Sequence, residues 1–83
     1  MHLEILSPEN KIFEGEVNSV IFPGSNGKFQ ILNNHAPLIS FLKEGEILYE
    51  KNNKNEKLSI SGGVVEVIKN KISALIEITP NQQ

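Results

Sequence analysis

Cysteine, arginine, aspartate and tryptophan are all absent from this 83-residue chain. Without cysteine the chain forms no disulfide and offers no thiolate for metal binding or nucleophilic catalysis. Its charged side chains are eight lysines and ten glutamates, which give a formal net charge of −2. Nucleic-acid binders concentrate basic side chains on one face, so this balance argues against that class of protein.

Long apolar runs are missing as well. No segment approaches the roughly 20 consecutive apolar residues that a membrane-spanning helix needs. The first four residues, Met1 to Glu4, lack the basic flank and the apolar stretch of a signal peptide. A chain of this length fits one domain, and it buries only about 60% of its unfolded surface, so its stability should be modest. We therefore expect a single small domain without direct insertion into a bilayer.

Apolar and polar residues alternate along most of the chain, a period of two that is typical of half-buried strands. Proline, glycine and asparagine separate these segments at intervals of about 8–12 residues, a spacing typical of a β-sandwich or a small barrel. Asn26-Gly27 can adopt the positive φ angles of a tight turn, and 52–55 is predicted to be a polar hairpin tip. No stretch shows helical periodicity. The pattern predicts an all-β fold, with alternating segments at residues 2–6, 28–32, 46–50, 57–61 and 72–78.

The alternation has informative exceptions. Several leucines stand on strand faces that otherwise look polar, and the segment 38–42 is apolar on both faces just after a proline. Two explanations stay open. The central strands of a sandwich are covered on both sides, or an apolar patch is exposed and docks on a partner. The misplaced leucines are Leu6, Leu32, Leu48 and Leu75.

Candidate catalytic motifs are weak. The segment Gly24 to Lys28 ends in Gly-Lys, but a phosphate loop needs glycine five positions before that Gly, serine or threonine after the Lys, and a helix. Here Phe22 and Phe29 occupy those two positions. His35 stands in a loop without other metal ligands nearby in sequence, whereas a metal site needs three or four. No nucleophile motif is present. We therefore expect no catalytic, cofactor-binding or metal-binding residues.

The string 61–67, Ser-Gly-Gly-Val-Val-Glu-Val, is the second notable motif. Paired glycines before a strand indicate a bulge or a residue with positive φ. Glu66 lies within an otherwise apolar strand. It is either a solvated side chain on an edge strand or a carboxylate that is buried or faces a partner and must find a donor there.

Taken together, these strings resemble the epsilon subunit of F-type ATP synthase, specifically its N-terminal β-sandwich domain. The resemblance runs nearly end to end, and the order and spacing of the motifs agree. The matching strings are 2–8, 13–17, 22–24 with Gly27, 35–38, Gly45 and 61–67.

The resemblance implies a small β-sandwich of about ten short strands in two sheets, with the domain over residues 1–79 and a short polar tail over 80–83. It implies a non-catalytic rotor subunit of the central stalk, bound to the gamma subunit and to the c-ring of the membrane sector. Such a subunit couples proton flow to ATP synthesis. Its place is peripheral, on the cytoplasmic face of the bacterial inner membrane.

The resemblance also implies two sets of interface residues. The region after the histidine motif, together with the first turn, would face gamma: Ser7, Pro8, His35, Ala36, Pro37, Leu38, Ser40 and Phe41. The loop after Pro23 would face the c-ring: Ser25, Asn26, Gly27, Lys28 and Phe29.

This chain departs from the family pattern at several places. Gln30 and Asn34 stand where the family commonly has glycine, and Lys28 stands where it often has an acid. Asparagine tolerates left-handed backbone, so Asn34 is a mild replacement, whereas Gln30 suggests a changed loop path. Most family members continue into a pair of C-terminal helices, and this chain ends soon after Pro80. We therefore expect coupling without self-inhibition by a helical arm, and no ATP binding.

Other functions compete with this interpretation. A biotinyl or lipoyl carrier domain would need a modified lysine at a hairpin tip, and Lys54 lies in one, but Asn53 and Asn55 flank it in place of the usual motif. An oligonucleotide-binding barrel fits poorly with five aromatic residues and no arginine. A small enzyme would need a catalytic constellation that the sequence does not show.

Overall fold

The computed structural model describes residues 1–78, and within them the chain forms nine strands and no helix. The polar tail predicted over 80–83 lies outside the described residues. No helix within residues 1–78 has the length and apolar character needed to cross a membrane. The strands are β1 (His2–Leu6), β2 (Lys11–Glu16), β3 (Ser19–Gly24), β4 (Gly27–Leu32), β5 (Leu38–Leu42), β6 (Gly45–Lys51), β7 (Lys54–Ile60), β8 (Gly62–Ile68) and β9 (Lys71–Glu77).

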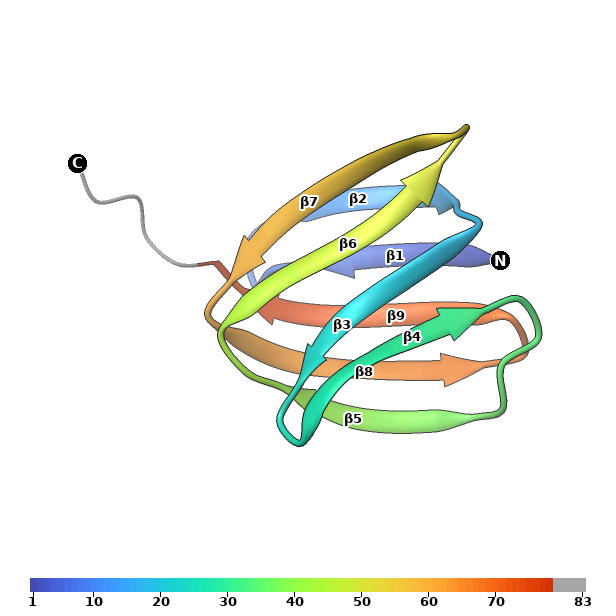
Figure 1. Cartoon of the computed structure of the whole chain (residues 1–83). Coiled ribbons are helices and arrows are strands. Elements are labelled where there is room, and N and C mark those ends of the chain that lie inside the picture. The colour runs from blue at the N-terminus through green and yellow to red at the C-terminus, as the bar shows by residue number, and fades with distance from the viewer. Residues whose placement is uncertain (79–83) are drawn as a thin grey trace.

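The strands stack in two layers, which confirms the predicted β-sandwich (Figure 1). One layer has the order β2-β1-β9-β8-β5, and the other has the order β4-β3-β6-β7. Residues 1–78 supply nine strands where about ten were predicted, and the two layers join into one curled sheet because β3 and β5 still pair at one position, Gly24 opposite Leu42. Two backbone hydrogen bonds flank this seam, from Ser25 N to the Phe41 carbonyl (3.0 Å) and from Lys43 N to the Pro23 carbonyl (2.9 Å).

The core lies between the two layers and is made of the inward residues of each alternating strand. Cross-strand neighbours share a face, so pairs such as Val20 with Ile31 and Val65 with Ala74 are buried together. Phe13 of β2 packs on Tyr49 of β6 with 4.7 Å between ring centroids, which covers the edge of the core far from the seam. The fully buried side chains include Leu3, Ile5, Val20, Phe22, Ile31, Ile47, Ile60, Val65, Val67, Ile72 and Ile76.

Tight turns join the strands where the sequence predicts them. The β6–β7 and β8–β9 hairpins have two-residue turns in which both residues have positive φ: 52° and 65° at Asn52-Asn53, and 51° and 63° at Lys69-Asn70. Such turns match the twist of the flanking strands. Between β3 and β4 the positive φ of 126° falls on Gly27.

The glycine pair at the start of β8 holds two strands unusually close together. Gly63 has a φ of 155°, which confirms the predicted positive φ, and a Cβ there would lie 2.5 Å from the backbone oxygen of Leu75 in β9. A Cβ added at Gly62 would lie no closer than 3.6 Å to its nearest neighbour, the Leu42 oxygen, which is an ordinary contact. Glycine is therefore required at the second position of the pair but not at the first.

Candidate partner-binding surfaces

An apolar row crosses the outer face of the five-stranded layer. The cross-strand register places Phe41 opposite Val64, Val64 opposite Leu75, and Leu75 opposite Leu6. Directly opposed residues point to the same side of a sheet, so these four side chains form one row across β5, β8, β9 and β1. Ile39 stands beside it on β5. Phe41 is 71% exposed and Ile39 69%. Contiguous exposed apolar side chains of this kind are typical of a surface that binds a partner.

A more polar row runs next to the apolar one. Glu66 of β8 lies opposite Ile39 on one side and Ser73 on the other, and Ser73 in turn lies opposite Glu4. Glu66 is exposed, but β8 lies between β5 and β9, so the interpretation of an edge-strand residue is wrong. Within residues 1–78, no cation lies within ion-pair distance of the Glu66 carboxylate.

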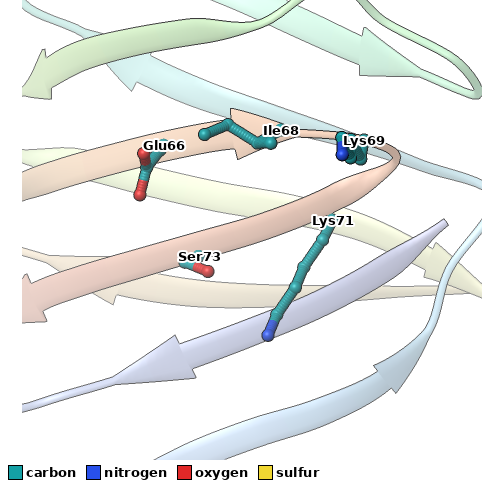
Figure 2. A pocket seen from close by; sticks show the side chains of 5 residues that line it. All are labelled: Glu66, Ile68, Lys69, Lys71 and Ser73. Carbon is teal, nitrogen blue, oxygen red and sulfur yellow. The ribbon is translucent and has the colours of Figure 1, made fainter.

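A shallow hollow of about 390 Å³ opens beside Glu66 (Figure 2). Its lining includes Ile68, Lys69, Lys71 and Ser73. Figure 2 shows that the Lys71 side chain extends over β1 and away from Glu66. The carboxylate is thus a free negative charge at the margin of an apolar surface, suited to a cationic side chain from outside.

Among the described residues, three of the four other acidic side chains in the strands of this layer have partners; the exception is Glu77 at the end of β9. The two ring nitrogens of His2 face the carboxylates of Glu14 (3.0 Å) and Glu16 (3.3 Å). Hydrogen bonds from Lys11 and then from His2 lower the pKa of Glu14, and hydrogen bonds from His2 and the terminal amine of Met1 lower the pKa of Glu16. Glu4 lies 3.9 Å from the Lys11 ammonium. This pairing leaves Glu66 in the middle of β8 and Glu77 at the end of β9 as the unpaired carboxylates of the layer within residues 1–78.

The eight residues predicted to face gamma do not form one cluster. Ser7 and Pro8 follow β1 at the end of the sandwich where Phe41 lies, and Pro8 and Phe41 line one hollow with Val64 and Leu75. His35, Ala36 and Pro37 lie in the β4–β5 loop at the opposite end (Figure 1).

The strand β5 runs between these two ends. Along it, Leu38 packs against the core, and Ser40 shares its inward side, so only the alternate positions are free for a partner. The residues that the sequence interpretation left out of the set are Ile39, Val64, Leu75 and Leu6. Two of them, Leu6 and Leu75, stand out in the sequence as leucines on an otherwise polar face, and this pattern alone could have indicated that they belong to an exposed apolar surface.

The five residues predicted to face the c-ring lie in the β3–β4 hairpin. Ser25 and Asn26 form its tip, and Gly27 and Lys28 are also exposed. Phe29 turns inward and packs near Phe22, with 5.7 Å between ring centroids. The bond from Ser25 N to the Phe41 carbonyl ties this tip to the end of the apolar row. The hairpin tip therefore adjoins the Phe41 end of the apolar row.

The loop that carries His35 begins with a tight turn. The backbone N–H of His35 donates to the Leu32 carbonyl (3.1 Å), and Asn34 adopts a φ of 66°, which confirms that asparagine here takes left-handed backbone. The Nδ1 of His35 lies 2.7 Å from the Ala36 carbonyl, so that nitrogen carries the proton and Nε2 stays free for a partner. Gln30 lies within β4 opposite Ile21, in regular pairing, so it does not change the path of the loop.

Within residues 1–78, no three histidine or acidic side chains converge on a possible metal site. Lys54 is the first residue of β7 and pairs with Lys51, immediately after the turn rather than at its tip. The chemistry that the described residues offer is that of docking: apolar contact, the unpaired Glu66 carboxylate beside it, and a polar hairpin tip.

Comparison with known proteins agrees with this arrangement. A family described as the ATP synthase delta/epsilon chain beta-sandwich domain matches residues 1–80. The ATP synthase epsilon chain of Desulfitobacterium hafniense is 47% identical over 75 residues, which cover 90% of this chain and 57% of that protein. The epsilon chain of Chlorobaculum tepidum is 45% identical over 76 residues, covering 90% of this chain and 86% of that protein. The chain thus spans little more than half the length of several relatives.

Solved structures share the fold. A chain in the mitochondrial ATP synthase of Euglena gracilis (OSCP/F1/c-ring) superposes with a TM-score of 0.84 at 21% identity, over 89% of this chain and 48% of that one. A chain in the central stalk and c-ring structure of the Tetrahymena thermophila enzyme gives a TM-score of 0.77 at 15% identity, over 92% of this chain and 62% of that one. With a family match over nearly all of its length, this chain belongs to the ATP synthase delta/epsilon beta-sandwich family.

Proposed function

We propose that this chain is a non-catalytic rotor subunit of an F-type ATP synthase, which links the gamma subunit to the c-ring and so couples proton flow to ATP synthesis. The observation that carries the proposal is the outer face of the five-stranded layer, where the apolar row lies beside the unpaired carboxylate of Glu66. Support comes from the names of the relatives, which are ATP synthase epsilon chains. The proposed location is peripheral, on the cytoplasmic face of the bacterial inner membrane.

The apolar row is the proposed docking surface for gamma. Phe41 and Leu75 supply apolar area, and Glu66 supplies a charge that favours a partner with lysine or arginine beside its own apolar strip. Ser7 and Pro8 extend this surface at one end. The His35–Pro37 loop extends it at the other end and offers the free Nε2.

The β3–β4 hairpin tip is the proposed contact with the c-ring. Its residues are small, polar and exposed, and suit the polar loops of a membrane ring. A packed β-sandwich deforms little under load, and the bond from Ser25 to Phe41 joins the tip to the gamma surface. A torque applied at the tip would therefore be transmitted to gamma, because no flexible segment of the described chain separates the tip from the gamma surface.

Reconstitution tests the proposal. An ATP synthase complex that lacks this subunit is mixed with the purified chain, and proton pumping and ATP hydrolysis are followed together. We expect pumping to return in proportion to bound chain, while the chain alone hydrolyses no ATP above a buffer blank. Binding without any recovery of pumping, or ATP turnover by the isolated chain that one substitution abolishes, would contradict the rotor function.

The substitution Lys28→Glu is expected to weaken attachment to an isolated c-ring and to leave the melting temperature unchanged. Lys28 is exposed at the hairpin tip and has no ion-pair partner within residues 1–78, and such surface changes stay within about 0.5 kcal/mol of the original stability. Lys54→Glu, beside the tip of the β6–β7 hairpin, is the matched control. Equal ring binding by both variants and the original chain would remove Lys28 from the contact.

A further inference from the structure

We propose that Asn70, in the turn between β8 and β9, is the positioning residue for the β4–β5 loop that presents His35 to the partner. This inference rests on the proposed function, in which that loop contacts gamma. The loop and the turn are 36 residues apart in sequence at their point of contact, yet they lie side by side at one end of the sandwich (Figure 1).

The Asn70 amide bonds to the loop through both of its polar atoms. Its Oδ1 accepts a hydrogen bond from the backbone N–H of Asn34 (2.7 Å), and its Nδ2 donates to the Oδ1 of Asn33 (2.8 Å). Its backbone carbonyl accepts from the N–H of His2 (3.1 Å). One residue therefore joins the loop, the β8–β9 hairpin and the start of β1.

The loop needs such a tie because its own turn is intrinsically weak. Asn34 occupies the third position of the turn that His35 N closes onto the Leu32 carbonyl, with a φ of 66°. Glycine is the residue that adopts this conformation without strain, and asparagine does so less readily. Asn33 and Asn34 are both exposed, so packing does not hold them. The hydrogen bonds to Asn70 therefore stabilise this turn, which the residues of the turn alone would hold only weakly.

The consequence for docking is preorganisation. The position of His35 follows directly from the turn, since its N–H closes that turn and its Nδ1 bonds to the next carbonyl, from Ala36. A loop held in its bound shape before contact binds more tightly, because less conformational freedom is lost on association. Asn70 thus acts on the partner through His35 without touching the partner itself.

The test replaces Asn70 by glycine. Glycine keeps the positive φ of 63° that the hairpin turn requires, so the strands stay paired while the amide is removed. Asn53→Gly is the matched control: Asn53 has a φ of 65° in the same kind of two-residue turn, and within residues 1–78 its side chain bonds to no other element. Asn70→Asp keeps an acceptor for the Asn34 N–H but loses the donor to Asn33.

Two quantities are measured on the full 83-residue chain. Amide hydrogen exchange at Asn34 reports the hydrogen bond from its N–H to the Asn70 Oδ1, because this exposed N–H has no other hydrogen-bond partner within residues 1–78. Affinity for an ATP synthase complex lacking this subunit reports docking. For Asn70→Gly we expect exchange at Asn34 to accelerate at least about tenfold and affinity to fall about tenfold. Asn70→Asp should lie between it and the original chain, and Asn53→Gly should change neither quantity.

The outcomes separate the two proposals. An unchanged exchange rate at Asn34 in Asn70→Gly would contradict the claim that Asn70 holds the β4–β5 loop. Faster exchange with unchanged affinity would overturn the positioning role. If the original chain itself fails to bind the complex, the proposed function fails, and the exchange measurement still decides whether Asn70 holds the loop.

Discussion

Gly63→Ala is expected to lower the free energy of unfolding by at least about 3 kcal/mol, because two independent costs coincide at this position. The φ of 155° is a conformation that residues with a Cβ rarely adopt. The added methyl group would also lie 2.5 Å from the Leu75 backbone oxygen and 3.0 Å from the Ile76 Cα, so β8 and β9 would have to separate. Urea unfolding followed by circular dichroism measures the loss.

The neighbouring glycine supplies the control. In Gly62→Ala the new methyl group meets only the Leu42 oxygen at 3.6 Å, and no positive φ is required. Its stability should stay within about 1 kcal/mol of the original chain. Equal losses at both glycines would show that strand entropy, and not the close approach of β8 to β9, dominates at this site.

Phe41→Ala is expected to weaken docking on gamma about 30- to 100-fold, the range of a large aromatic side chain that becomes buried in an interface. Phe41 is 71% exposed in the free chain, so the substitution removes little from the core and the melting temperature should hardly move. Titration of the chain into a complex that lacks this subunit measures the affinity.

Leu32→Ala is the control for this prediction. Leu32 is also a large exposed apolar residue, 52% exposed, but it lies at the end of β4 in the other layer. Its removal should leave affinity within about twofold of the original. If Leu32→Ala weakened docking as much as Phe41→Ala, the apolar row could not be the main contact with gamma.

The all-β class and most of the core followed from the alternation of side chains, since that pattern directly reports which residues face inward. The strand ends did not follow from it. The sequence pattern assigned Gly62 and Lys54 to turns, whereas both begin strands. Backbone pairing continues past the last apolar side chain, and no side-chain pattern marks that point. The pattern assigned Pro23 to a turn for the same reason, although it is buried within β3.

The apolar row was only half visible in the sequence. Leu6 and Leu75 stood out as apolar residues on polar faces, but nothing local showed that they belong to one row with Phe41. That row depends on which strands are neighbours, and above all on the parallel pairing of β1 with β9. Such long-range register is set by the global packing of the layers. The separation of Ser7 from His35 at opposite ends of the sandwich was hidden for the same reason.

The pairing of β1 with β9 also sets the order in which this chain can fold. His2 pairs with Lys71, 71 − 2 = 69 positions further along, so closing this contact costs about 4 kcal/mol of chain entropy before any packing compensates for it. During synthesis, β1 leaves the ribosome together with one neighbour, β2, but well before its other neighbour, β9. The five-stranded layer cannot assemble strand by strand as the chain emerges. Completion of this layer is therefore a late event: a chain released before Lys71 would contain all four strands of the other layer but would lack β9, without which the five-stranded layer cannot close.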